Sequence, residues 1–333
     1  MNEYLKLLEY FLYAFFFTLV LSPLVISAIK KERVGQTILH YVESHKGKDG
    51  TPTMGGIIFL ISISIVSVIC FSSQSMLARM SIIVFLSFGI VGFLDDFIKF
   101  KFKRNLGLRA YQKILFQVGV SIGIGIFVYK FCGSVILLPF SNYSLDLGVW
   151  IIPFVAVIYI ATTNSVNLTD GLDGLASSTT FVYLFSFLVL QIILSGKGVI
   201  ASNVFMGEEM KNMLMLNAVA CGALLCFLLF NCFPAKIFMG DTGSLALGSL
   251  VASVAIFSGL ELYLPILGIL FVASSVSVIL QVAYYKLTKK RIFLMAPLHH
   301  HFERKGVHEV RITLCYTLIG IVVGAVTILI NIL

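Results

Sequence analysis

The sequence has little charge. Only 12% of its 333 residues are Asp, Glu, Lys or Arg, whereas 59% are hydrophobic, and the mean hydropathy is +1.00. A soluble globular domain carries about 25% charged residues. The shortage of charge therefore excludes a soluble globular protein and predicts an integral membrane protein.

Several familiar motifs are also missing. The six cysteines form no C-x-x-C pair and lie in or beside apolar runs, which favours packing roles over disulfides or a metal cluster. No G-x-x-x-x-G-K-[ST] phosphate loop is present. No cleavable signal peptide is evident. Because the first apolar run is long and ends at Lys30 and Lys31, we expect it to remain as a membrane anchor.

Long apolar runs dominate what is present. A helix needs about 20 apolar residues to cross the hydrocarbon core of a membrane. The strands of a β-barrel would be short and alternating, so the runs predict an all-α polytopic membrane protein with about ten transmembrane helices. Glu261 and Pro265 divide the eighth run from the ninth, and residues 1–333 are expected to form a single domain. The predicted helices cover residues 8–29, 54–74, 78–98, 114–138, 149–166, 174–195, 212–233, 243–260, 262–285 and 312–332.

Basic residues are distributed unevenly between the two sets of loops. The loops that follow odd-numbered runs hold 19 of the 24 lysines and arginines. The positive-inside rule therefore places these loops in the cytoplasm and both chain termini outside. This placement accounts for the net charge of +8 better than binding to nucleic acid does, so no nucleic-acid partner is predicted. The other five basic residues are Lys6, Arg79, Lys130, Lys197 and Lys211.

Five aspartates lie at the predicted cytoplasmic ends of apolar runs. A carboxylate at membrane depth is costly unless it is paired, hydrated or bound to a metal, so it indicates a functional site. Five of them on one side of the membrane predict a single site there. They are Asp95, Asp96, Asp170, Asp173 and Asp241.

The stretch "GFLDDFIKFK" contains the first two aspartates. The adjacent carboxylates of Asp95 and Asp96 repel each other, and a divalent cation or a lysine would relieve the repulsion. Lys99 follows Asp96 by three residues and shares its helical face. A solvated helix end with an ordinary ion pair explains the motif equally well when it is taken alone. Its Phe and Leu neighbours and its membrane depth favour a site.

The stretch "NSVNLTDGLDGLA" is rich in amides and carboxylates. Asn164, Asn167 and Asp170 are spaced at i, i+3 and i+6, which predicts a polar face at the end of a helix. The glycines permit a tight turn and a close approach to a ligand. Asp173 alone is also explained as an N-cap of the next helix.

The stretch "NCFPAKIFMGDTGS" begins with Asn231 and leads into another apolar helix. Asp241 fits an N-cap, and it also offers the hard oxygen that Mg²⁺ prefers. The glycines beside it leave room for phosphate at a helix N-terminus. Phe238 has the shape to stack on a nucleobase, although membrane packing explains it as simply.

Basic and imidazole side chains lie in two other loops. In "HKGKDGTPTMGG", Lys48 and Thr53 are suited to phosphate, although a loop that only sets topology is the simpler explanation. In "PLHHHFE", three consecutive histidines cannot all reach one zinc ion from regular structure. His299, His300 and His301 fit a negatively charged, hydrogen-bonding substrate better.

Four motifs together carry a family resemblance. "LDDFIK", "NLTDGLDGLA", "FMGDTGSLALG" and "PLHHHFE", in this order, resemble the polyprenyl-phosphate N-acetylhexosamine-1-phosphate transferases. "GTPTMGG" and "PLHHHFE" are similar to the bacterial phospho-N-acetylmuramoyl-pentapeptide transferases within them. The resemblance covers nearly the whole chain, including the ten-run layout.

The resemblance implies a reaction and its partners. The donor would be UDP-N-acetylmuramoyl-pentapeptide and the acceptor undecaprenyl phosphate, giving lipid I and UMP with Mg²⁺ as cofactor. This is the first membrane step of peptidoglycan synthesis. The enzyme would be a homodimer among the lipids of the bacterial plasma membrane.

The resemblance also implies roles for residues. Asp95 would be the base or orienting group for the lipid phosphate, and Asp96 and Asp241 would lie at the metal. His300 would act on the donor. The substrate-side residues would be Lys48, Thr53, Lys99, Lys113, Asn164, Asn167, Asp170, Asp173, Asn231, Phe238, Gln281, His299 and His301.

Three other functions share some of these features. A sibling transferase that uses UDP-N-acetylglucosamine would share the aspartates, although "PLHHHFE" favours the muramoyl donor. An ion-coupled transporter would also bury carboxylates, but near the membrane midplane. A structural magnesium-binding scaffold would need Asp241 for folding and would show no turnover.

Overall fold

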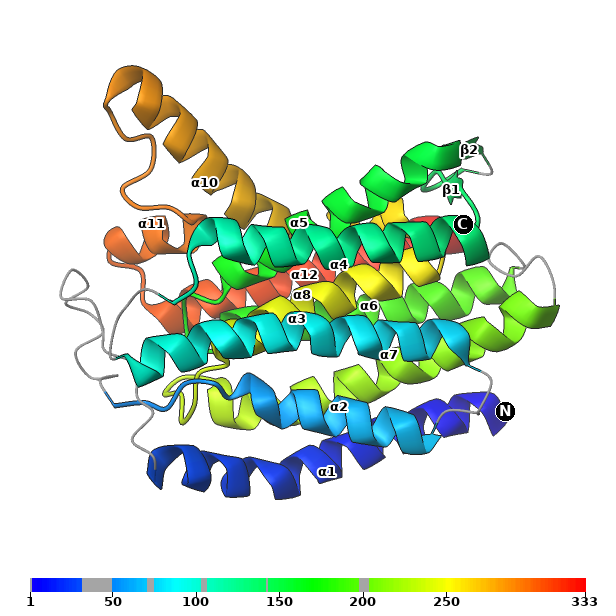
Figure 1. The fold of residues 1–333 in the computed structure, drawn as a ribbon, viewed down its shortest axis with the longest axis horizontal. Coiled ribbons are helices and arrows are strands. Elements are labelled where there is room, and N and C mark those ends of the chain that lie inside the picture. Colours follow the sequence, from blue (N-terminus) through cyan, green and yellow to red (C-terminus); the bar gives the residue numbers. More distant parts are fainter. Residues whose placement is uncertain (1, 32–49, 71–74, 103–106, 142, 198–203) are drawn as a thin grey trace.

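The fold is a bundle of long helices with one small hairpin (Figure 1). The computed structural model describes residues 2–31, 50–70, 75–102, 107–141, 143–197 and 204–333. Its helices are α1 (Asn2–Lys31), α2 (Gly56–Cys70), α3 (Met76–Lys101), α4 (Ala110–Phe131), α5 (Ile151–Thr169), α6 (Leu175–Gly196), α7 (Val204–Asn231), α8 (Gly240–Phe257), α9 (Leu264–Leu267), α10 (Ile269–Thr288), α11 (Leu298–Arg304) and α12 (Glu309–Ile332). The two strands are β1 (Val135–Leu137) and β2 (Ser144–Asp146), which pair antiparallel.

The prediction of an all-α polytopic membrane protein is confirmed. Within the described residues, nine helices are long and apolar enough to cross a membrane, and α2 is a shorter apolar helix of 15 residues. Each of the ten predicted runs overlaps one of these ten helices. The chain is therefore a multi-pass membrane protein.

The bounds of the predicted runs differ from those of the helices by up to eight residues, as at the start of α7, and two runs extend past a break in the helix. The run over 114–138 stops as a helix at Phe131, because Gly133 takes a positive φ of 96° and the chain then enters β1. The run over 262–285 is broken into a 3₁₀ turn, α9 and α10. Pro265, which has no backbone N–H, lies in the short α9, and Gly268 separates α9 from α10.

Helix α8 is the centre of the bundle. Every residue from Thr242 to Phe257 is buried, and α2, α3 and α5 pack around the helix. Both chain ends lie at one end of the bundle, and α10 leans away from the other helices (Figure 1). The end of α3 that bears Asp95 and Asp96 lies at the opposite end from the termini.

Glycines set how closely α2 and α3 approach α8. A Cβ built on Gly92 of α3 would lie 2.1 Å from the backbone oxygen of Asp241. A Cβ on Gly56 of α2 would lie 2.3 Å from the Cα of Gly243. Real side chains do not come so close to backbone atoms, so only glycine permits these crossings. Small residues serve the same purpose at many helix interfaces in membranes.

The cysteines are free thiols, as expected from their spacing. Cys221 and Cys226 are buried in α7, which agrees with a packing role. Cys232 and Cys315 are exposed, so the packing role does not extend to them.

A buried acid, Glu261, lies at the end of the bundle that holds the termini. Its Oε2 has no hydrogen-bond partner within the described part of the chain, and only 5% of the residue is exposed. Burial raises the pKa of Glu261 from 4.5 to about 8. The unfolded chain ionises first as the pH rises, so this residue favours the folded state less and less between about pH 4.5 and pH 8.

We expect Glu261→Gln to flatten the pH dependence of stability. The melting temperature of the wild-type protein in detergent should fall more between pH 5 and pH 8 than that of the variant, because the variant has no proton to lose. Glu208→Gln is the control, since the Glu208 side chain is 67% exposed. Parallel melting curves for the wild type and Glu261→Gln across this range would contradict the expectation.

Candidate active site

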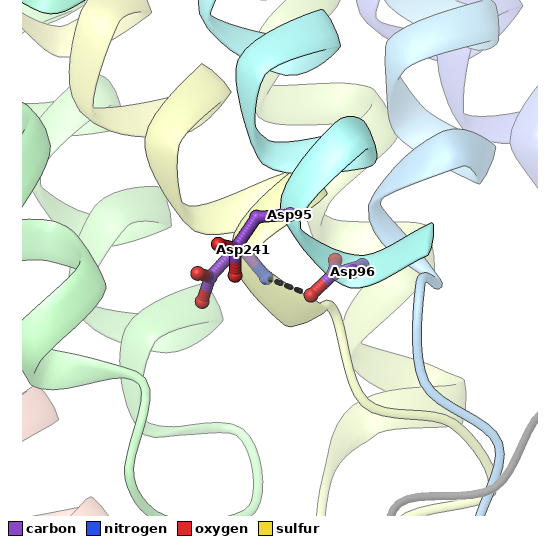
Figure 2. Close-up of side chains that lie close together, drawn as sticks. All are labelled: Asp95, Asp96 and Asp241. Atoms are coloured by element: carbon purple, nitrogen blue, oxygen red, sulfur yellow. Dashed lines mark hydrogen bonds between the residues drawn. The ribbon is translucent and has the colours of Figure 1, made fainter. Parts of the chain in front are cut away.

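Three aspartates from two helices converge at one end of the bundle. Asp95 and Asp96 come from the last turns of α3, and Asp241 comes from the first turn of α8 (Figure 2). One oxygen from each lies within 4.8 Å of the others. Asp95 and Asp96 are buried, whereas the Asp241 side chain keeps 17% of its surface exposed. Three hard oxygen donors at this spacing suit a divalent cation such as Mg²⁺.

Two lysines neutralise much of this charge. Lys99 Nζ lies 2.6 Å from Asp95 Oδ2 and 3.2 Å from Asp241 Oδ2. Lys113 of α4 contacts the same two carboxylates, at 3.0 Å from Asp95 Oδ2. The lysine side chains are 33% and 24% exposed, so both can reach an anion that enters from solution. The site therefore combines metal-type ligands with phosphate-type donors.

Asp96 anchors the start of α8. Its Oδ1 accepts from Asp241 N at 3.2 Å (Figure 2). Its Oδ2 accepts from Thr242 N at 2.9 Å and from Thr242 Oγ1 at 2.7 Å. These backbone groups belong to the first turn of the helix, which favours an anion. Asp241 is not the N-cap of α8, which is Met239, so Asp96 takes the role that an N-cap side chain would have.

The amides of α5 reach the cluster in part. Asn167 Nδ2 donates to Asp241 Oδ1 at 3.0 Å and to Ser244 Oγ at 2.8 Å. Asn164 Nδ2 donates instead to Gln117 Oε1 at 2.8 Å. The two amides lie on α5, but Asp170 lies just beyond its end, so the expected single helical face of three groups is wrong.

Asp170 nevertheless belongs to the same electrostatic environment. Burial raises the pKa of Asp170 well above its usual range, and the carboxylates of Asp241, Asp96 and Asp173 raise it further. Three of the other four predicted aspartates therefore influence Asp170. Asp173 Oδ2 accepts from Ala235 N at 2.9 Å, which ties the turn before α6 to the loop before α8. The N-cap position of α6 is Gly174, so the simpler explanation of Asp173 as the cap is wrong.

The histidine helix α11 lies against the α5–α6 turn. A Cβ on Gly171 would lie 2.3 Å from His299 Nε2 and 2.9 Å from His300 Nε2. His299 is fully buried, and neither of its ring nitrogens has a hydrogen-bond partner among the described residues. Burial, with His300 adding to it, lowers the pKa of His299 to about 3, so this ring stays neutral.

The other two histidines point to different partners. His300 Nδ1 lies 2.8 Å from Glu303 Oε2. His301 Nδ1 accepts from Leu294 N at 3.1 Å, and its ring also meets the edge of Phe293. His299 and His300 therefore face Gly171, whereas His301 holds the loop before α11.

The loop before α8 completes the surroundings of the aspartates. Phe238 N donates to Pro52 O at 2.8 Å, and Gly55 N donates to Phe238 O at 2.8 Å, while the Phe238 side chain is half-buried. A Cβ on Gly240 would lie 3.0 Å from Thr53 Oγ1, which places that hydroxyl at the start of α8. Asn231 Nδ2 donates to Ile237 O at 2.9 Å and shapes the loop from within.

Comparisons with known proteins agree with this geometry. Residues 78–259, which include the whole aspartate cluster, match the model of glycosyl transferase family 4. Residues 48–60 match phospho-N-acetylmuramoyl-pentapeptide-transferase signature 1. The transferase of that name from Clostridium botulinum (strain Eklund 17B / Type B) is 43% identical over 93% of this chain and 92% of its own length. The transferase from Clostridioides difficile (strain 630) is 39% identical over 96% of this chain and 95% of its own length. The transferase from Thermoanaerobacter sp. (strain X514) is 40% identical over 93% of this chain and 93% of its own length.

The chain belongs to the phospho-N-acetylmuramoyl-pentapeptide-transferase family. The resemblance found in its motifs is thus confirmed over nearly its full length.

Not every predicted site residue of this transferase lies at the cluster. Gln281 of α10 binds the loop before α11, where its Oε1 accepts from Phe293 N at 2.9 Å and Ile292 N at 3.1 Å. Lys48 lies outside the described residues. Roles for both remain predictions.

Sequence reasoning also missed several contributors. Gln117 pairs with Asn164, and Ser244 pairs with Asn167. Leu108 N donates to Asp95 Oδ1 at 2.7 Å, so a backbone group holds that carboxylate. Gln117 and Leu108 lie outside the recognised motifs. The proximity of Ser244 to Asp241 in sequence was the only available signal.

Proposed function

We propose that this transferase moves phospho-N-acetylmuramoyl-pentapeptide from UDP to undecaprenyl phosphate, with formation of lipid I and release of UMP. The observation that carries the proposal is the meeting of three carboxylates and two lysines at one end of a membrane bundle. Phosphoryl transfer depends mainly on in-line positioning and on neutralisation of charge, and this cluster is suited to both. Similarity to phospho-N-acetylmuramoyl-pentapeptide-transferases over nearly the full length of the chain supports this choice of donor and acceptor.

Mg²⁺ is the proposed cofactor, with Asp241 and Asp96 as its ligands. Asp241 is the partly exposed member of the cluster, so it is accessible to a hydrated ion. Asp96 Oδ2 accepts two hydrogen bonds, from Thr242 N and Thr242 Oγ1, whereas Oδ1 accepts one, from Asp241 N, so a lone pair of Oδ1 is left for the ion. Bound Mg²⁺ would supply Lewis-acid stabilisation of the charge on the diphosphate.

The chain's own residues then orient the two phosphates. Lys99 and Lys113 hold the negative oxygens of the donor, and Asn167 fixes the Asp241 carboxylate through its 3.0 Å hydrogen bond. Asp95, buried between the lysines, orients the acceptor side. An acceptor phosphate oxygen bonds to the β-phosphorus of the donor while the bond to the bridging oxygen breaks, and UMP departs with that oxygen. The lipid phosphate is already an anion, so direct attack needs no covalent aspartyl-phosphate, which is the rival mechanism.

The histidine helix is proposed to bind the donor. His299 is neutral, so its contribution would be a hydrogen bond and not positive charge. His300 lies beside His299 and against Gly171, where it is placed to bind the sugar or the diphosphate of the donor. Phe238 and Asp170 are the proposed contacts for the nucleoside, with Asp173 and Asn231 shaping the loop beneath them.

The proposed orientation places this site in the cytoplasm, where a UDP-linked donor would be found. The loops at this end of the bundle carry most of the lysines and arginines. Ten crossings, with the short α2 as one of them, would leave both termini outside, in accord with their common position in Figure 1. A homodimer in the bacterial plasma membrane is also proposed.

The proposed function is tested by measurement of UMP release. We expect the purified protein to release UMP from UDP-N-acetylmuramoyl-pentapeptide when undecaprenyl phosphate and Mg²⁺ are present. A chelator should stop turnover, and added Mg²⁺ should restore it. UDP-N-acetylglucosamine is the matched donor, and faster turnover with it would assign the chain to the sibling reaction. Undiminished rates in excess chelator would remove the metal from the proposal.

We expect His300→Ala to lower kcat/KM for the donor about tenfold, the loss expected for one charge-assisted hydrogen bond. Steady-state kinetics at varied donor concentration measures this. His308→Asn is the control, because His308 caps α12 away from Gly171. Kinetics equal to the wild type would leave α11 a packing element only.

A further inference from the structure

A cavity lies at the end of the bundle opposite the aspartate cluster. Its volume is about 660 Å³, within the range of about 300–1,000 Å³ that is typical of ligand pockets. It is formed where α1 and α7 begin and where α2 and α6 end. None of the proposed catalytic or substrate-binding residues lines it.

The lining contains both charged and apolar side chains. Among the described residues of the lining, Lys6 and Lys211 contribute positive charge and Glu208 is the only acid, so their net charge is +1. Lys211 Nζ lies 2.9 Å from Glu208 Oε1, so the excess positive charge of these three side chains corresponds to Lys6. Apolar surface comes from residues such as Leu7, Ile192, Leu214 and Met215.

The two lysines are unusual for this side of the membrane. Only five basic residues of the chain fall in the sparsely charged set of loops and termini, and two of the five line this cavity. Tyr4 and Tyr10 lie beside them, and tyrosine is the residue that proteins place at the level of lipid headgroups. Lysines, tyrosines and apolar side chains in one lining match an amphiphile with an anionic head.

We propose that this cavity binds an anionic phospholipid, with the phosphate between Lys6 and Lys211 and an acyl chain along the apolar lining. Lysine is a compact donor suited to phosphate. Juxtamembrane lysines attract anionic lipid in a roughly additive way. The site is independent of the transferase reaction, because it lies at the other end of the bundle.

The glycines of the cavity make a sharp test possible. Gly207 and Gly196 both line it, and a Cβ built on either meets no atom of the described residues within 4 Å. Gly207 lies in α7 without a positive φ, so a larger residue fits the backbone there. Gly207→Phe should therefore fill the cavity without disturbing the fold. Gly119→Phe is its matched control, since Gly119 is an exposed glycine of α4 with equally open surroundings.

The experiment is native mass spectrometry of the delipidated protein with phosphatidylglycerol or phosphatidylcholine. We expect the wild type to retain phosphatidylglycerol selectively. Lys6→Gln/Lys211→Gln should weaken this binding about 30-fold, and Gly207→Phe should abolish it. Gly119→Phe and the charge control Lys130→Gln/Lys197→Gln should bind like the wild type. UMP release should be the same in all these proteins, which separates this test from that of the proposed function.

Several results would overturn the proposal. Equal retention of the two lipids would show that no anionic head is recognised. Displacement of phosphatidylglycerol by millimolar inorganic phosphate would assign the cavity to free phosphate. Unchanged lipid binding in Gly207→Phe would place the lipid elsewhere, and a change in oligomeric mass there without a change in lipid would identify a contact between copies of the chain.

Discussion

Asp241→Asn is expected to lower the rate of UMP release about 10³-fold. The change is isosteric, and the remaining side-chain oxygen can still accept from Asn167 Nδ2. What it removes is the negative charge that Lys99 and Lys113 face and that a divalent cation would need. Loss of one group that stabilises transition-state charge typically costs about 10²–10³-fold, and a weakened metal site adds to that.

Stability must be measured beside the rate, because a scaffold would behave differently. Asp241→Asn should melt within a few degrees of the wild type in detergent, since Asp96 still holds the start of α8 through Thr242. Asp146→Asn is the matched control, as Asp146 is an exposed aspartate of β2. Unfolding of Asp241→Asn together with loss of turnover would favour a structural magnesium site. Full turnover would remove Asp241 from the mechanism.

Much of the fold follows from the sequence because long apolar runs predict transmembrane helices. The ten apolar runs predicted where the ten apolar helices lie, the short α2 included. The charge of the connecting loops predicted which helix ends lie on the same side of the membrane. The errors came from features that depend on contacts between elements. Helix α4 ends before Gly133, which has a positive φ, and the hairpin that follows depends on the pairing of Val135 with Asp146, which no apolar count reveals.

The site was predictable where a costly residue had no local explanation. Asp95, Asp96 and Asp241 are aspartates in apolar surroundings, and all three met as expected. Residues whose presence is explained by a simple local role were harder to place. Gln281, for example, is held by the backbone of residues 292–293, a contact that sequence spacing cannot indicate.

Buried partners of helix ends were also invisible to sequence reasoning. Glu209 of α7 is 2% exposed, and its carboxylate accepts from Met76 N at 2.7 Å and from Leu77 N at 2.8 Å. It thus caps α3 from a position more than 130 residues away in the sequence. The N-cap residue Ser75 makes no side-chain cap of its own. Both ends of α3 are therefore fixed by long-range contacts.

Gly92→Ala is the second variant for which we expect a large effect, because α3 and α8 approach each other closely at Gly92. Gly92 lies one helical turn before Asp96, and its Cβ would be 2.1 Å from Asp241 O and 2.6 Å from Thr242 N. Ordinary contact requires more than 3.4 Å, so the two helices must separate by about 1 Å or more. A misplacement of about 1 Å in an active site can cost about 10²-fold in rate. Overpacking of this kind costs about 1–3 kcal/mol of stability. We therefore expect Gly92→Ala to lose about 10²-fold in UMP release and several degrees in melting temperature.

Two sets of glycine variants separate this crossing from general effects of a methyl group. For Gly89→Ala, one turn earlier on α3, the three atoms nearest the new Cβ belong to the side chain of Leu60, which can move, so a small loss is expected. Gly119→Ala and Gly123→Ala on α4 meet no atom within 4 Å and should be neutral or slightly stabilising, because alanine favours helix. The graded order of these losses follows from what each new Cβ would touch. If Gly92→Ala kept the rate of Gly119→Ala, the distance between α3 and α8 would not control the geometry of the aspartates. The active site would then tolerate a shift of the two helices that ion pairs of 2.6–3.2 Å do not accommodate.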